Sequence, residues 1–153
     1  MAYLRKSLWT IAAIAALPAP AMAQEMCAAL SRIAAAAREP VPFASLEGGR
    51  GLVPGYSYCR VETGTTARAG GVFCHSQFAP KSLIAEAVGA QVRDCLGAVP
   101  GRTLDRLPPA TLTYLTDQLS ISVSSHCDER CHVGRLASLD IRRRVEDGTP
   151  QPR

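Results

Sequence analysis

Two stretches of the chain place apolar residues at helical spacing. Residues 24–38 are rich in alanine, and residues 80–96 begin with Pro80 and are followed by Gly97, which suit the start and the end of a helix. In both stretches an apolar residue returns every three or four positions, the period of an amphipathic helix. These residues are Met26, Leu30, Ile33 and Ala37, and then Ile84, Val88, Val92, Cys95 and Leu96. We therefore expect one helix in each stretch.

Alternation between apolar and polar positions predicts a first hairpin. Residues 56–62 and 71–77 are strand-like and flank a small, polar link. One register joins two cysteines and also matches two valines, which supports it. It pairs Cys59 with Cys74, Val61 with Val72, Tyr58 with His75 and Arg60 with Phe73.

A second hairpin is predicted further along the chain. Residues 111–116 are rich in strand formers, and residues 118–124 and 133–141 alternate in the manner of paired strands. The link 128–130 has a common hairpin length. Leu136 is out of phase and indicates a bulge. In the expected register Cys127 faces Cys131 and Leu119 faces Leu139.

The element order is helix, hairpin, helix, hairpin, which predicts an α+β fold of two helices packed on an antiparallel sheet of about four strands. Residues 1–23 have the charged start, apolar run and Ala-Met-Ala cleavage site of a secretory signal peptide. We expect a single domain over residues 24–145, with Arg142–Arg144 at its solvated end, and a flexible C-terminal tail over residues 146–153.

All six cysteines follow the leader, and an even number of cysteines in an exported chain predicts a disulfide framework. If the helices run antiparallel, the start of the first lies beside the end of the second. The expected pairs are Cys27–Cys95, Cys59–Cys74 and Cys127–Cys131. The expected location is the bacterial periplasm or the exterior, where disulfides persist.

Charge and hydropathy exclude two classes of partner. The formal net charge is +4 at pH 7, and two of the cations, Arg5 and Lys6, belong to the leader. This is too little for an electrostatic nucleic-acid binder. After the leader, no apolar run approaches the length of a membrane span. We expect neither nucleic-acid binding nor a membrane span.

Residues 126–132 are the strongest candidate for a haem or metal site, because they contain two histidines and two cysteines in seven positions. The segment resembles a lengthened c-type haem attachment motif, C-x-x-C-H, as in periplasmic cytochromes. That resemblance implies thioether bonds at Cys127 and Cys131 and an axial ligand at His132. However, the spacing is one residue too long and the flanks alternate like strands. A surface metal site between His126 and His132 is a further alternative, but we favour a disulfide hairpin with no cofactor.

No catalytic motif singles out an enzyme class. The chain contains no nucleophile elbow, phosphate-binding loop or zinc-protease motif. His75 and Ser76 are neighbours on a predicted strand and therefore point to opposite faces. A small hydrolase would need a site assembled from distant residues, with His75 or His132 as its base. We expect a protein that is not an enzyme.

One predicted surface favours a binding function. Aromatic residues mixed with Arg and His are typical of interface anchors. On one face of the first hairpin the candidates are Tyr56, Tyr58, Arg60, Phe73 and His75. Alternatively, this face packs under a helix and the face with the cysteines and valines is exposed. The leading hypothesis is an exported binding or accessory protein, such as an inhibitor, immunity-type factor or chaperone-like partner, acting on another exported protein or an envelope component.

Overall fold

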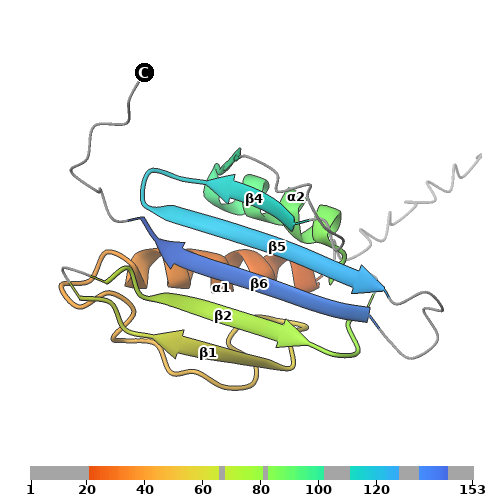
Figure 1. Cartoon of the computed structure of the whole chain (residues 1–153), viewed down its shortest axis with the longest axis horizontal. Coiled ribbons are helices and arrows are strands. Elements are labelled where there is room, and N and C mark those ends of the chain that lie inside the picture. Colours follow the sequence, from red (N-terminus) through yellow and green to blue (C-terminus); the bar gives the residue numbers. More distant parts are fainter. Residues whose placement is uncertain (1–20, 66–67, 81–82, 102–110, 128–134, 145–153) are drawn as a thin grey trace, which may run out of the picture.

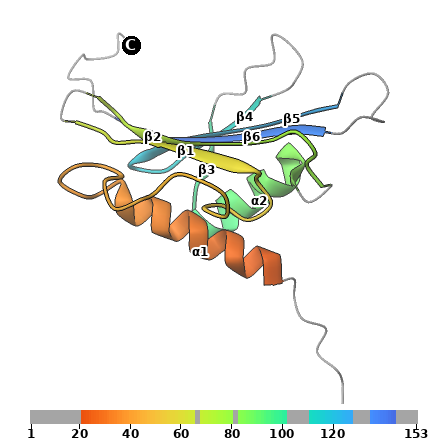
Figure 2. The same ribbon diagram turned by 90° about the horizontal axis from the view of Figure 1, so that it is seen from below.

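Both helices lie on one face of a single antiparallel sheet (Figure 1). The computed structural model describes residues 21–65, 68–80, 83–101, 111–127 and 135–144. Its elements are α1 (Ala21–Ala36), β1 (Tyr58–Glu62), β2 (Gly71–Ser76), α2 (Ala85–Leu96), β3 (Val99–Pro100), β4 (Thr111–Leu115), β5 (Leu119–Cys127) and β6 (Arg135–Arg143). Figure 2 shows α1 and α2 together on one side of the sheet. The α+β class expected from the sequence is confirmed.

The sheet has six strands in the order β1-β2-β6-β5-β4-β3, and the expected number of about four is wrong. The pattern misses β3 because its two residues are too few to alternate, and it assigns β4 to neither hairpin. In the sheet, β4 pairs with β5, and β3 pairs with β4. The last strand, β6, lies between β2 and β5, so it joins the two predicted hairpins into one sheet.

The register of the first hairpin is confirmed. Strands β1 and β2 pair Cys59 with Cys74 and Val61 with Val72, and the two cysteines form a disulfide. Both cysteines are buried on the helix side of the sheet. The next pair outward, Ser57 and Ser76, is joined by a hydrogen bond of 2.9 Å between the two hydroxyl oxygens.

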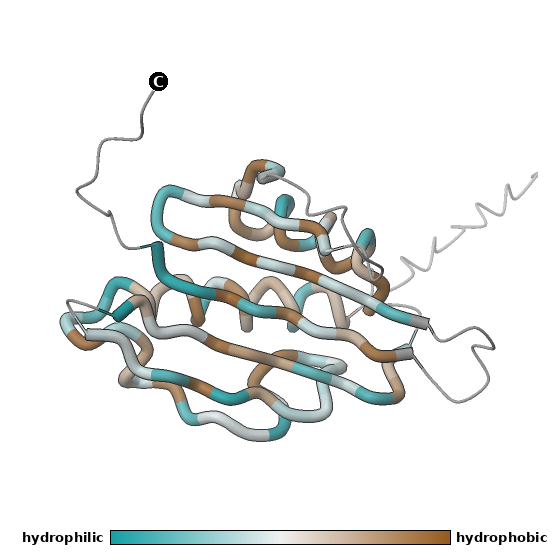
Figure 3. Tube along the Cα trace, viewed as in Figure 1, coloured by the Kyte–Doolittle hydropathy of each residue, from teal (hydrophilic) through white to brown (hydrophobic). Residues whose placement is uncertain are grey.

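The register expected for the second hairpin is wrong by four residues. Leu119 pairs with Arg143, and Leu139 pairs with Val123. The observed register places Ile121 opposite Ile141, so large apolar side chains meet across both central pairs and are fully buried. A shift by an even number keeps every side chain on its face of the sheet, which explains why alternation alone does not detect it (Figure 3). The expected 128–130 link and the Cys127–Cys131 disulfide fall outside the described residues and side chains.

Strand β6 is regular where a bulge is expected. Its pairing with β5 continues without interruption through Leu136, which is 52% exposed on the face away from the helices. The strand also extends through Arg142 and Arg143, which the sequence places at a solvated end. Arg142 therefore belongs to the sheet near the end of β6, between Gly71 on β2 and Ser120 on β5.

The core lies between the helices and the sheet. Its fully buried aliphatic side chains include Leu30 and Ile33 on α1, Val88 and Val92 on α2, and Val72, Ile121, Leu139 and Ile141 on the sheet. Burial of each such side chain contributes about 1.5–3 kcal/mol. Gly89 lets α2 approach β4 closely, because a methyl group there would overlap the ring of Tyr114.

A disulfide between Cys27 and Cys95 joins the N-terminal half of α1 to the last turn of α2. Helix α2 ends at Gly97, which has a φ of 62° and donates its N–H to the carbonyl oxygen of Arg93 at 2.9 Å. Helix α1 begins at Ala21, before the expected cleavage site, whereas most of the expected signal peptide and the whole of the expected tail lie outside the described residues. None of the described helices is long and apolar enough to cross a membrane.

We predict that C27A/C95A lowers the free energy of unfolding by about 4 kcal/mol, because the bond closes a long loop and so restricts the unfolded chain. Its two cysteines are 68 residues apart. Urea unfolding of the oxidised protein measures the loss. C27S/C95S is the matched control, which has side chains close in size to cysteine and should lose the same amount. A loss below about 1 kcal/mol would mean that packing alone holds the helices together.

Candidate binding surface

The outer face of the sheet, opposite the helices, carries most of the residues expected to bind a partner. Tyr58 is 45% exposed, and Arg60 and His75 are exposed as well. Cys59 and Val72, which alternate with these residues, are buried under the helices. Of the two arrangements that the sequence leaves open, the structure has the one in which the aromatic and basic side chains face outward.

Tyr56 is the exception, and its assignment to this surface is wrong. Only 5% of it is exposed. It precedes β1, and its N–H donates to the carbonyl oxygen of Val53 at 3.3 Å in a turn, so the alternation of the strand does not reach it. Its buried hydroxyl has no hydrogen-bond partner among the described residues. Burial, and then the negative charge of Asp140, raise the pKa of this hydroxyl.

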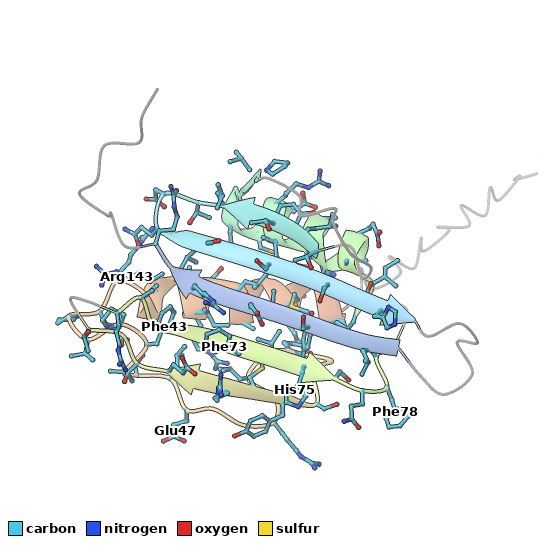
Figure 4. All side chains as sticks on the ribbon, in the orientation of Figure 1. Phe43, Glu47, Phe73, His75, Phe78 and Arg143 are labelled. Carbon is cyan, nitrogen blue, oxygen red and sulfur yellow. A yellow bond between two sulfur atoms is a disulfide. The ribbon has the colours of Figure 1, made fainter. Side chains whose placement is uncertain are left out.

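Two arginines flank the ring of Phe73, a residue that Figure 4 labels on β2. The guanidinium carbon of Arg60 lies 5.3 Å from the ring centroid, and that of Arg142 lies 5.0 Å from it. Gly71 permits the close packing of β2 against β6 and the Phe73 ring here, because a Cβ there would lie 2.5 Å from the carbonyl oxygen of Ile141 and 3.1 Å from Cζ of Phe73. We call Tyr58, Arg60, Phe73, His75 and Arg142 the aromatic–arginine patch.

The charges in and beside the aromatic–arginine patch are unevenly paired. Arg60 forms an ion pair of 2.8 Å with Glu62, both largely exposed, and such a pair contributes little to stability. Asp140 is half-buried beside Phe73, and burial raises the pKa of its carboxyl against the opposing effects of Arg142 and Arg60. Among the described residues, Arg142 makes no ion pair and contacts the Phe73 ring.

Apolar side chains extend the aromatic–arginine patch towards one end of the sheet. The rings of Tyr58 and His75 lie 5.9 Å apart across β1 and β2. Phe78 follows the end of β2 and is 73% exposed (Figure 4). Leu136 lies at the same end, since the neighbouring Ala137 pairs with the last residue of β2. Aromatic rings, guanidinium groups and exposed apolar side chains therefore share one half of the outer face.

The other half of the outer face is small and hydroxylated. On β5 it presents Ser120, Ser122 and Ser124. The hydroxyl oxygens of Ser124 and Ser138 lie 2.7 Å apart in a hydrogen bond. Large side chains therefore cluster over β1, β2 and the neighbouring part of β6, and the aromatic–arginine patch stands beside a flat surface.

The alternatives for metal, haem and hydrolase chemistry depend mostly on residues outside the described part of the chain. Cys131 and His132 lie outside it, whereas His126 is on β5 and pairs with Leu136. Within the described residues, no three His, Cys, Asp or Glu side chains gather to hold a metal ion. His75 faces outward, whereas Ser76 is buried on the opposite face, so the two cannot act as a catalytic pair.

Two hollows among the described residues lie on the helix side. One of about 260 Å³ is bounded by α1 and the turn from β4 to β5, with Arg38 and Asp117 in its wall. A second, of about 400 Å³, lies between α1 and the segment that precedes β1, with Glu25 and Arg32 in its wall. Neither contains a histidine or an aromatic side chain, so the outer face remains the better candidate for a site.

Two residues beside Phe73 are missing from the sequence-based site. Asp140 and Arg142 alternate with the buried Leu139 and Ile141, so their outward direction is visible in the pattern of β6. Their place beside Phe73 is not visible, because it depends on the pairing of β6 with β2, two strands whose first residues, Arg135 and Gly71, are 64 residues apart in the chain.

Comparison with known proteins assigns no family: no family model, curated protein or solved structure matches the chain. Its function must therefore be inferred from the surface itself, since a fold alone does not imply an activity.

We predict that Tyr56→Phe raises the free energy of unfolding by about 1 kcal/mol, because it removes a buried hydroxyl that has no partner to offset its lost hydration. Urea unfolding measures the change. Tyr58→Phe is the matched control, since Tyr58 is 45% exposed and its hydroxyl stays hydrated. A destabilised Tyr56→Phe would show that this hydroxyl is hydrogen-bonded in the folded protein.

We predict that Asp140→Asn stabilises the protein at neutral pH. Because the pKa of Asp140 is raised in the folded chain, the folded state holds the proton more tightly than the unfolded state. This contribution is fully present below the ordinary aspartate pKa and is lost as the pH rises through the raised value. Urea unfolding should therefore show a stability gain for Asp140→Asn at about pH 7 that disappears at about pH 3.

Asp117→Asn, in the exposed turn between β4 and β5, is the charge-matched control for Asp140→Asn. It removes the same charge without removing a half-buried carboxyl. Equal gains from the two substitutions at neutral pH would show that net charge, and not the burial of Asp140, causes the effect.

Proposed function

We propose that this chain is a non-enzymatic exported binding protein that captures another exported protein on the outer face of its sheet. The observation that carries the proposal is the outward position of the aromatic–arginine patch, opposite both helices. Aromatic and arginine side chains form the energetic centres of protein interfaces, because they bury much area while keeping polar groups in fixed directions.

The arrangement around the patch supports a protein partner. Tyr58, Phe78 and Leu136 expose apolar surface towards one end of these strands, and Arg60 and Arg142 add charged donors beside the Phe73 ring. Apolar area next to guanidinium groups is the composition of an interface centre. The patch rests on paired strands tied by the Cys59–Cys74 disulfide, so little ordering is needed when a partner binds.

Export is supported by two kinds of observation. Residues 1–23 have the pattern of a secretory signal peptide. The Cys27–Cys95 and Cys59–Cys74 disulfides are bonds of a kind that persists in oxidising compartments such as the periplasm or the exterior. A protein or envelope component in the same compartment could therefore bind to the exposed outer face.

A photo-crosslinking experiment tests the proposal. We replace Tyr58 with benzoylphenylalanine, which preserves an aromatic ring, and do the same at Val41 in a control. Val41 lies in the segment after α1 and has a similar exposure, 51% against 45%. In the source cells, irradiation should give one protein adduct of defined mass from position 58 and none from position 41. No adduct from position 58, or the same adduct from both positions, would contradict the proposal.

We predict that Tyr58→Ala weakens binding of the crosslinked protein about thirtyfold or more, because truncation of an interface centre costs about 2 kcal/mol or more. Val41→Ala should leave the affinity unchanged, and titration calorimetry with the purified partner measures both. The free energy of unfolding of both variants should stay within about 0.5 kcal/mol of the parent, as for other exposed positions. An unchanged affinity for Tyr58→Ala would refute the proposed function.

A further inference from the structure

We infer that the patch recognises a carboxylate on an acidic segment of the partner protein, that Arg142 is the residue that binds it, and that Asp140 weakens this binding. This inference rests on the proposed function, because it names the chemistry that the aromatic–arginine patch would recognise. Three features of the outer face carry it: the unpaired charge of Arg142, the support given by Phe73 and Gly71, and the balance of charge around them.

Arg142 has a guanidinium group that no described residue engages in a hydrogen bond or ion pair. Arg60 is held by Glu62 at 2.8 Å, and Arg144 donates to the carbonyl oxygen of Thr116 at 2.8 Å. Among the described residues, Arg142 has no hydrogen bond or ion pair, and it lies exposed over the Phe73 ring. An arginine presents parallel N–H donors that match a carboxylate, so an external carboxylate would supply the missing partner.

The position of Arg142 is set before any ligand arrives. Its backbone belongs to β6, which is paired on both sides, to Gly71 on β2 and to Ser120 on β5. The ring of Phe73 lies 5.0 Å from its guanidinium carbon, and the lack of a side chain at Gly71 leaves space for that ring. A side chain that is already ordered loses less entropy on binding, which strengthens the ion pair that it can form.

The charge balance favours a single carboxylate over a polyanion. Arg60 and Arg142 are opposed by Glu62 and Asp140, so these four groups sum to no net charge. Anionic membranes and nucleic acids are attracted by clusters of positive charge, which this surface does not present. A carboxylate beside an apolar side chain suits it better, because the Phe73 ring supplies apolar contact next to both guanidinium groups.

Asp140 is placed to compete with such a carboxylate. It lies two residues before Arg142 on the same face of β6 and pairs with Phe73 on β2. It is half-buried, and burial already raises the pKa of its carboxyl. A second carboxylate brought to Arg142 would meet the repulsion of Asp140 at close range. Removal of this charge should therefore strengthen binding.

The probe is a short fluorescent peptide with blocked ends that carries one glutamate flanked by tyrosines, and the same peptide with lysine in place of glutamate is the control of opposite charge. The oxidised full chain is titrated into each, and binding is followed by fluorescence anisotropy. We expect the glutamate peptide alone to bind. Arg142→Gln should weaken its binding about tenfold or more, the loss of one charge-assisted bidentate contact. Arg142→Lys retains the charge but not the parallel donors, so its affinity should fall between that of the parent and that of Arg142→Gln. Asp140→Asn should bind more tightly than the parent.

Arg144→Gln is the matched control, because it removes the same charge from an exposed arginine that is already engaged. Equal weakening by Arg142→Gln and Arg144→Gln would overturn the inference, because it would indicate attraction by net charge alone. Absence of binding to the glutamate peptide would overturn it as well. So would binding to phosphatidylglycerol vesicles in place of the glutamate peptide, which would assign the surface to a lipid headgroup.

The outcomes separate this inference from the proposed function. If Tyr58→Ala weakens capture of the crosslinked partner and Arg142→Gln does not, the patch binds a protein but not through a carboxylate. If Tyr58→Ala has no effect on capture, the proposed function fails first. Circular dichroism of each variant checks that the fold is retained, and loss of affinity in a folded Arg142→Gln supports the inference.

Discussion

The pairing of β6 with both β2 and β5 is the constraint on which the rest of the structure depends. It converts two separate hairpins into one sheet and places a C-terminal strand at its centre. Because alternate residues of a strand point to opposite faces, the same pairing directs Leu139 and Ile141 into the core and Asp140 and Arg142 outward. One strand thus completes the apolar layer beneath the sheet and the charged surface above it.

Coverage of one face by both helices gives the two sides of the sheet different compositions. The inner face is aliphatic, and the disulfide between Cys27 and Cys95 holds α1 and α2 over it. The outer face needs no large apolar side chains for stability, and over β5 it is built from serines. The large rings of Tyr58 and Phe73 on that face therefore contribute little to the core, which makes a role in binding the more economical explanation.

Local pattern predicts the parts of this fold that depend on neighbours in sequence. The first hairpin follows from its alternation, because Cys59 and Cys74 also mark which residues face each other. The second register does not follow, because a shift of four residues leaves every side chain on the same face and only long-range packing of Ile121 against Ile141 selects it. Tyr56 is misplaced for a related reason, since alternation cannot show where a strand begins. The position of Arg142 beside Phe73 depends on strand order, which no local pattern contains.

The electrostatics of the outer face explain why a patch with two arginines need not bind anions without selectivity. Arg60 is neutralised by Glu62, and the carboxyl of Asp140 lies near both arginines but is half-buried. Long-range attraction depends on net charge and is screened by salt within about 10 Å, whereas a guanidinium group held against an aromatic ring acts at contact distance. A surface of this kind selects partners by the fit of one ion pair beside apolar contacts, and so depends on the exact placement of Arg142 by the central strand.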